Sequence, residues 1–363
     1  MAKKARVWDG TAWQELASAQ TDLTAYSTTA QTTSGFRNAI INGDFRINQR
    51  AFTSTTTSGT YGFDRWVLIT NDGTCTHSTQ AFTVGNAISG YEPINHARMV
   101  TSGQTLAGAF SILVQKIEDV RTFAGQTITI SFWAKAASGT PKVVVETEQY
   151  FGSGGSPSAN VTTYAGQATL STSWNRYSVT VAVPSISGKT LGTTAGSSFF
   201  ELNLWTSAGT NFNARTNSLG IQSTTIDFWG VQVEPGAVAT PFEQRPIGTE
   251  LALCKRYYQR YSGGAGCGLT GIAHVTNGIL ANFSLNIDMR VAPNASASGQ
   301  IIISDQYLTD PTATSASVGA TQSPNASGGR LTLVGFSGLT VGRYYSTPGA
   351  SLGSGFVDFS AEL

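Results

Sequence analysis

Cysteine, histidine and charged residues are scarce in this sequence. Three cysteines and three histidines occur in 363 residues, 12% of the residues are charged, and the formal net charge is +1. The cysteines, Cys75, Cys254 and Cys267, are too few for a disulfide framework or a four-ligand zinc site. The composition also argues against nucleic-acid binding, which needs a clustered basic surface, because the one basic run, at residues 3–6, is short.

Long apolar runs and complete catalytic motifs are missing as well. No stretch approaches the roughly 20 apolar residues of a membrane helix, and none follows the basic start, so we expect neither membrane insertion nor a signal peptide. His77, His96 and His274 belong to no metal-binding His pair, and there is no phosphate loop. A Gly-x-Ser-x-Gly match at Ser351 has no histidine after it and is interpreted as a turn. The sequence therefore predicts a protein that is not an enzyme.

Glycine is abundant, with 40 residues, and Ser, Thr and Asn are plentiful, which favours an all-β chain with many turns. Short alternating segments without helical patterns between them are typical of a sandwich or barrel. The absence of a fixed-period repeat argues against a β-helix. The expected strands are residues 39–45, 65–70, 97–101, 110–117, 127–134, 142–151, 165–170, 175–183, 199–205 and 225–234, and then 279–289, 300–303, 329–334 and 355–363.

Four regions follow from this pattern. Residues 1–37 are an extended N-terminal arm, in which Trp8 and Trp13 flank an Asp-Gly turn of a small hairpin and are the candidate residues for attachment to other proteins. The polar tract at 18–35 is either a flexible leader or a segment that becomes ordered on docking. Residues 38–246 are a jelly-roll β-sandwich, 247–262 a connector and 263–363 a smaller C-terminal β-sandwich domain. The connector, helical or extended, is either an inter-subunit seam or the first strand of the C-terminal domain.

Side-chain alternation separates each strand into two faces. In three strands one face is apolar, and the other mixes aromatic rings with hydrogen-bonding groups: Trp133, Lys135, Glu146, Glu148, Tyr150, Glu201, Asn203 and Trp205. Such residues suit a sugar, whose C–H face stacks on an aromatic ring while its hydroxyls bond carboxylates and amides. The alternative is that they form cross-strand pairs or fill a subunit interface.

Three carboxylates among these residues also raise the question of catalysis. Glu146, Glu148 and Glu201 are the one group that resembles the acid pair of a glycosidase. On a solvent-facing sheet we expect them to stay ionised and to act as hydrogen-bond acceptors. Trp66 is expected in the core, and Trp229 is expected either to pack inside the protein or to line a neighbouring subunit. The neighbours Asp64 and Arg65 are expected to form a turn or an edge rather than a site.

Three stretches resemble carbohydrate-binding modules of the galactose-binding-like jelly-roll type. They are residues 38–45 (NAIINGDF), 124–136 (AGQTITISFWAKA) and 226–236 (IDFWGVQVEPG). Four further segments resemble the domain junction and C-terminal part of phage tail-fibre and minor tail proteins. They are residues 231–246, residues 250–260, the DMRVAP segment at 288–293 and the FSAEL ending at 359–363.

The resemblance implies a bacteriophage virion protein, a tail fibre or minor tail protein assembled in the bacterial host cytoplasm. It implies a homotrimer that contacts other virion proteins, projects outward and binds host surface glycans without catalysis. The alternative is a capsid decoration or head-fibre accessory subunit with protein contacts alone. No cofactor is expected. A structural calcium at Asp44, Glu118, Asp119 or Asp227 stays open, although Trp229-Gly230 stand where calcium-binding modules carry paired Asp residues.

Overall fold

The computed structural model describes residues 36–85, 88–262, 269–305, 312–313, 317–346 and 355–363, together with two short N-terminal strands, β1 (Arg6–Trp8) and β2 (Trp13–Glu15). β1 and β2 pair antiparallel with Trp8 opposite Trp13, as the expected hairpin requires. Side chains of this hairpin, and the remainder of the expected arm before residue 36, lie outside the described residues.

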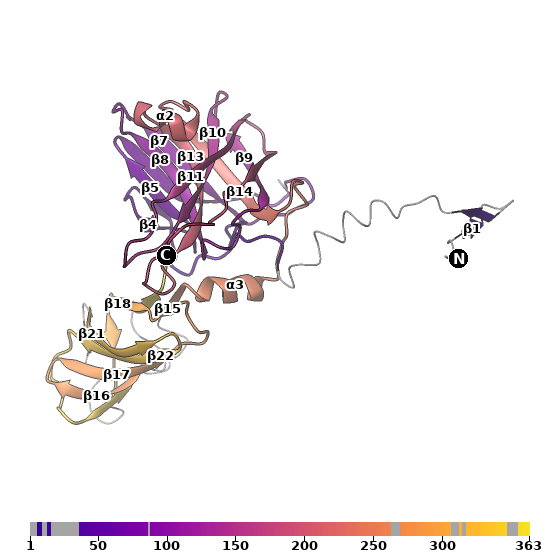
Figure 1. Ribbon diagram of the computed structural model, residues 1–363. Coiled ribbons are helices and arrows are strands. Elements are labelled where there is room, and N and C mark those ends of the chain that lie inside the picture. Colours follow the sequence, from indigo (N-terminus) through magenta and orange to yellow (C-terminus); the bar gives the residue numbers. More distant parts are fainter. Residues whose placement is uncertain are drawn as a thin grey trace.

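The larger domain is a jelly-roll β-sandwich of two six-stranded antiparallel sheets (Figure 1). Sheet I contains β4 (Thr60–Tyr61), β5 (Val67–Asn71), β8 (Phe110–Glu118), β10 (Lys142–Tyr150), β11 (Val161–Thr169) and β13 (Phe199–Ala208), in the order β11-β10-β13-β8-β5-β4. Sheet II contains β3 (Ser54–Thr55), β6 (Thr74–Ala81), β7 (Asn95–Ser102), β9 (Thr127–Ala136), β12 (Asn175–Ala182) and β14 (Thr224–Pro235), in the order β12-β9-β14-β7-β6-β3.

The core of the sandwich lies between the two sheets, where the apolar side of each alternating strand is buried. Phe132 of β9, Leu202 of β13 and Phe228 of β14 are fully buried in it. Trp66 and Trp229 are also fully buried, which confirms the expectation for both. The outer faces of sheets I and II are consequently the surfaces on which polar residues and ligands can meet.

The segment at residues 39–45 is not the strand that its resemblance to a jelly-roll opening predicts. It is irregular, and Asn42 and Phe45 have positive φ angles of 58° and 57°. The Asn42 side chain accepts a hydrogen bond from the Ile47 amide at 2.8 Å and donates to the carbonyl oxygens of Ile47 and Asp64. These bonds satisfy the backbone locally in place of a strand partner.

The connector is helical first and extended afterwards. Helix α3 (Ile247–Lys255) is followed by β15 (Tyr258–Ser262), which pairs with β24 (Phe356–Ser360) of the C-terminal part. The residues at 258–262 thus form a first strand of the smaller fold. Whether they also meet another subunit stays a prediction.

The C-terminal part is a smaller β-sandwich with its own core, which includes Ile279, Leu331 and Phe359. One sheet has the order β15-β24-β18, with β18 at Asn294–Ser298. The other contains β16 (Thr270–Val275), β17 (Gly278–Ser284), β21 (Ser317–Asn325), β22 (Gly328–Val334) and β23 (Tyr344–Ser346), in the order β21-β22-β17-β16-β23. A two-stranded pair joins β19 (Ile301–Ile302) and β20 (Thr312–Ala313).

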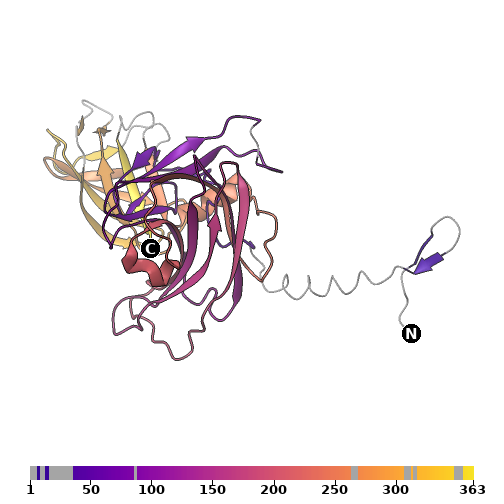
Figure 2. The ribbon, with the colours of Figure 1, turned by 90° about the horizontal axis from the view of Figure 1, so that it is seen from above.

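The chain ends against the larger domain, as Figures 1 and 2 both show. Glu362 pairs with Arg50 and Arg65, and the carbonyl oxygen of Leu363 accepts hydrogen bonds from Tyr61 and Lys116. Asp64 and Arg65 lie in a turn, as the sequence predicts, and the buried Arg65 side chain is in addition an ion-pair partner of Glu362. No helix in the described part of the chain is long and apolar enough to cross a membrane.

Candidate functional site

The eight residues of the predicted sugar-binding face are divided between the two sheets. Trp133 and Lys135 belong to β9 of sheet II, and the other six belong to β10 and β13 of sheet I: Glu146, Glu148, Tyr150, Glu201, Asn203 and Trp205. The two sets therefore lie on opposite outer faces of the sandwich. The expectation of one shared face is wrong, because alternation identifies the side of a strand and not the sheet to which the strand belongs.

On sheet I, Glu146 is fully buried beneath α2 (Asn213–Thr216), which follows the short 3-10 helix η1 (Thr210–Phe212). Arg215 of α2 donates to both carboxylate oxygens of Glu146, at 2.7 and 2.8 Å. Trp205 Nε1 and Asn203 Nδ2 donate to the same carboxylate at 2.9 and 3.3 Å. Glu146, Asn203 and Trp205 are thus mutually satisfied inside the protein and are not offered to a ligand.

The accessible remainder of this face is a row beside Glu148. Glu148 lies opposite Glu201 in the β10–β13 pairing, and Asn160 donates to Glu148 at 2.6 Å. Tyr164 of β11 lies on the same side and is 37% exposed. Tyr150, in contrast, is stacked on Phe199 with a centroid distance of 4.5 Å. This row of Tyr164, Glu148 and Glu201, which we call the open row, combines one exposed ring with two half-buried carboxylates.

On sheet II, part of the outer face is closed by an aromatic cluster formed by Tyr91, Trp133, Trp229 and Phe242. Trp133 contacts Trp229 at a centroid distance of 5.4 Å and Tyr91 at 5.5 Å. A bulge in β14 makes room for it, since Gly230 has a φ of +61° and a Cβ there would lie 2.7 Å from the Trp133 ring. Trp133 is only 7% exposed, so it is a packing residue.

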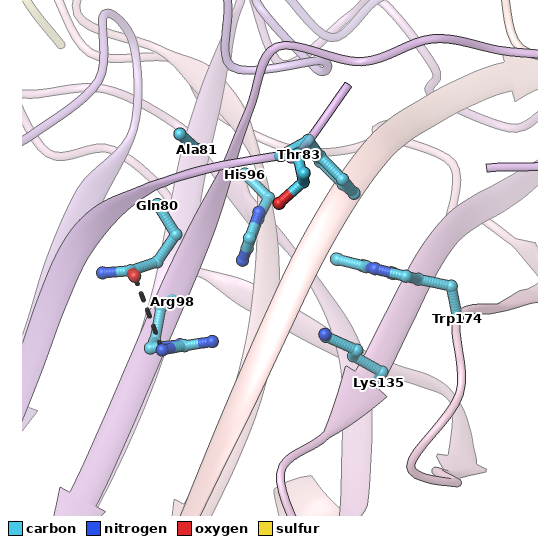
Figure 3. Close-up of a pocket in the computed structure, with 8 residues that line it drawn as sticks. Gln80, Ala81, Thr83, His96, Arg98, Lys135 and Trp174 are labelled. Carbon is cyan, nitrogen blue, oxygen red and sulfur yellow. Dashed lines mark hydrogen bonds between the residues drawn. The ribbon is translucent and has the colours of Figure 1, made fainter. Parts of the chain in front are cut away.

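Next to this cluster, sheet II carries a pocket of about 440 Å³, within the range of about 300–1,000 Å³ that small-molecule sites occupy. It is lined by Gln80, Ala81, Phe82, Thr83, His96, Arg98, Lys135 and Trp174. In Figure 3 the side chains of His96, Arg98, Lys135 and Trp174 point toward a common space. We refer to this hollow as the sheet II pocket.

Asp227 of β14 organises the charges of the pocket. Arg98 of β7 donates to both its oxygens, Nε to Oδ1 at 2.7 Å and Nη2 to Oδ2 at 2.9 Å. His96 Nε2 and Lys135 Nζ lie 3.3 and 3.7 Å from Oδ2. Burial opposes ionisation of Asp227, but the hydrogen bonds from Arg98 and the neighbouring His96 prevail and hold its pKa at about 2. Asp227 is therefore ionised at neutral pH, and its carboxylate lies beside the side chains of Arg98, His96 and Lys135.

The aromatic wall of the pocket comes from Trp174 and Phe82. Trp174 lies in the turn between β11 and β12, and Phe82 directly follows β6. Their ring centroids are 5.3 Å apart, His96 packs edge-on against Trp174, and Lys135 Nζ lies 5.3 Å from the Trp174 centroid. Both rings are half-buried, so each keeps a surface that a ligand can cover.

Lys135 is the one residue of the predicted sugar-binding set that lines this pocket. Trp174, Phe82 and Arg98 were not predicted, because they come from a turn, a strand end and a separate strand. One signal for Trp174 is present in the sequence: a single indole stands in the polar tract Ser171–Asn175, where no core strand requires it. His96, which belongs to no metal-binding motif of the sequence, forms part of the pocket.

The four loose calcium candidates do not fit a metal. Asp44 pairs with Arg46, Glu118 with Arg256, Asp119 with Arg121, and Asp227 with Arg98. No group of three or more His, Cys, Asp or Glu residues that could hold a metal occurs within the described residues. Cys75 and Cys254 are buried free thiols, whereas Cys267 and the turn at Ser351 lie outside the described residues.

Comparison with known proteins gives likenesses of fold. No family model and no curated protein matches the sequence. Among solved structures, the chain is similar to the enzymatically active domain of tailspike protein 4 of bacteriophage CBA120, with 14% identity, a TM-score of 0.32 and coverage of 55% of this chain and 22% of that one.

Two further structures are matched over their whole length. A putative sugar binding protein from Bacteroides thetaiotaomicron shows 15% identity and a TM-score of 0.34, over 55% of this chain and 100% of that one. The CBM22-1 xylan-binding domain of Paenibacillus barcinonensis Xyn10C shows 11% identity and a TM-score of 0.30, over 56% and 100%. At such low identities and TM-scores the likeness supports no statement about activity, and the jelly-roll assignment rests on the strand order.

Proposed function

We propose that this protein is a bacteriophage structural protein, a tail fibre or minor tail protein, that binds host surface glycans through the sheet II pocket. The observation that carries the glycan-binding part is the half-buried Trp174 ring beside fixed hydrogen-bonding groups on His96, Arg98 and Lys135. An aromatic ring accepts the C–H face of a pyranose, and the fixed polar groups orient its substituents. The virion part rests on the phage-like domain junction in the sequence.

Binding without catalysis fits the chemistry of the pocket. A glycosidase needs two carboxyl groups, one of them protonated at the working pH. The acidic group at the pocket floor is Asp227, whose pKa of about 2 keeps it ionised and whose oxygens are already occupied by Arg98. It can hold the site in shape but cannot donate a proton near neutral pH.

A second candidate function, that of a head-fibre or decoration subunit with protein contacts alone, is favoured by one surface of the smaller domain. Ile272 and Tyr344 are paired across β16 and β23 and are 40% and 60% exposed. Val275 and Val341 are also exposed. Exposed apolar residues that lie together are typical of contacts between proteins.

A glycan array of host surface polysaccharides tests the proposal. We expect the wild-type protein to bind at least one glycan and Trp174→Ala to lose that binding while keeping the wild-type melting temperature. Trp174 is a better residue for this test than Trp133 or Trp205, because the latter two are buried and their loss would disturb the fold. Absence of binding to every host glycan would favour the second candidate. Release of reducing ends from a bound polysaccharide would contradict a purely binding role.

A further inference from the structure

The polar groups that the sheet II pocket offers to a ligand are mainly hydrogen-bond donors. Arg98 uses Nε and Nη2 on Asp227, while its Nη1 has only a long contact of 3.5 Å to Gln80 Oε1, drawn in Figure 3. Lys135 Nζ is 3.7 Å from Asp227, which is an ion pair without a hydrogen bond. Both cations therefore keep N–H groups for a ligand. The Asp227 oxygens, in contrast, are already engaged.

A buried histidine adds a second, independent sign of a ligand. His96 lines the pocket and is 5% exposed, and among the described residues its Nδ1 has no hydrogen-bond partner. A buried polar atom left without a partner costs free energy, so such atoms are usually satisfied by a bound group or water. The imidazole ring lies edge-on to Trp174 at a centroid distance of 5.3 Å, so His96 borders the aromatic wall.

The charges that surround the pocket indicate whether the bound ligand group is positive or negative. Arg98 and Lys135 carry two positive charges against one negative charge on Asp227, so the pocket is cationic even with His96 neutral. A ligand group that only accepts hydrogen bonds and carries a negative charge would complete the donors and balance the charge. A hydroxyl group would satisfy the donors without balancing the charge.

We propose that the sheet II pocket binds an acidic saccharide, with the sugar carboxylate between Lys135 and Arg98, the pyranose face on Trp174 and a sugar hydroxyl at Nδ1 of His96. This inference rests on the proposed glycan-binding function and narrows its ligand to carboxylate-bearing sugars. A small inorganic anion would use the same donors. It would leave the Trp174 surface uncovered, so the indole ring distinguishes an acidic sugar from a bare anion.

The test compares each acid with its own neutral form. Oligogalacturonate, alginate oligosaccharides and sialyllactose are titrated beside their carboxyl methyl esters, with dextran sulfate as an anion that lacks carboxylates. We expect at least one acid to bind and its ester to bind about tenfold more weakly, as loss of a charge-assisted hydrogen bond requires. Lys135→Gln should weaken the acid and leave the ester unchanged. Lys142→Gln removes the same charge at an exposed position on sheet I and should change neither.

The possible failures are distinguishable. Equal binding of acid and ester, lost in Trp174→Ala, would overturn the acidic ligand and leave glycan binding intact. A third outcome is that dextran sulfate binds wild type and Trp174→Ala with equal affinity, and that acids and their esters bind equally. This outcome would show a general anion site and overturn the inference. If no acid binds while neutral glycans of the array do, the inference fails alone. If no saccharide of either kind binds, the proposed function fails with it.

Discussion

Glu201 shows how position on a covered sheet changes a carboxylate. It lies between Glu148 of β10 and Lys116 of β8 in the register of sheet I. Burial raises the pKa of Glu201 to about 7, and the negative charge of Glu148 adds to the rise. The expectation that the carboxylates of this face all stay ionised is therefore wrong for Glu201 near neutral pH.

This pKa predicts a pH-dependent stability. Because the folded-state pKa of about 7 lies above the ordinary glutamate pKa of 4.5, the folded protein binds the proton more tightly than the unfolded chain. The resulting stabilisation is present below about pH 4.5 and is lost as the pH rises through 7. Glu201→Gln keeps the side chain neutral, so calorimetry should find its melting temperature above that of wild type at pH 8 and close to it at pH 4.5.

The control for this prediction is Glu92→Gln, which removes an exposed carboxylate elsewhere in the same domain. We expect it to leave the difference between pH 4.5 and pH 8 as in wild type. An equal gain from Glu201→Gln at both pH values would contradict the raised pKa.

At the scale of elements, the bulge of β14 determines which part of sheet II is open. Gly230 in the left-handed region lets Trp133 pack against the β14 backbone, and the aromatic cluster closes that part of the face. Beyond it, β9, β14 and β7 present Lys135, Asp227 and Arg98 in adjacent positions, which makes the pocket floor. The bulge thus separates a packed region from a binding region on one sheet.

Substitution at this bulge should be costly. In Gly230→Ala the new Cβ meets the Trp133 ring at 2.7 Å in a left-handed backbone, so we expect a loss of about 3 kcal/mol in urea unfolding. Gly220→Ala is the matched control, since its φ is +81° with nothing within 4 Å, and should lose only about 1 kcal/mol. Equal losses in the two variants would show that Trp133 does not rest on Gly230.

The positions of the main strands along the chain were largely predictable from sequence, whereas the site was not. Strong apolar alternation identified the segments that become β8, β9, β10, β13 and β14. The polar strand β6, which carries His77 and Gln80, gave no such signal and was missed. The site depends on what covers each face, namely Arg215 over Glu146 and Phe242 over Trp133, and such long-range contacts leave no local pattern.

At the scale of the whole molecule, the C-terminus joins the two folds. Arg65 is 1% exposed, stacks on Tyr257 at 3.4 Å from the ring centroid, and pairs with Glu362. Arg256 of the connector pairs with Glu118 at the end of β8. Two ion pairs therefore hold the smaller domain to the larger one. Arg256 forms the first just before the C-terminal part, and Glu362 forms the second at its end. The domain bounds stay a prediction, and β15 of the predicted connector pairs with β24 of the smaller fold.

Breaking this link should destabilise the protein strongly. Glu362→Ala leaves the buried Arg65 charge without its partner, and we expect a loss of about 3 kcal/mol in denaturant unfolding. Arg65→Met combined with Glu362→Ala removes both charges, so the loss in this double variant should be smaller than the sum of the losses in Arg65→Met and Glu362→Ala alone. Strict additivity in this double-mutant cycle would contradict the importance of the pair.

The central claim, that the sheet II pocket is the glycan site, is tested most directly by calorimetric titration of the strongest array ligand into two matched variants. Trp174→Ala removes the aromatic wall of the pocket, and Tyr164→Ala removes the exposed ring of the open row on sheet I. We predict that Trp174→Ala weakens binding by at least about tenfold, as loss of a stacking ring requires, and that Tyr164→Ala binds like wild type. Loss of binding in Tyr164→Ala with retention in Trp174→Ala would place the site on sheet I and contradict the account.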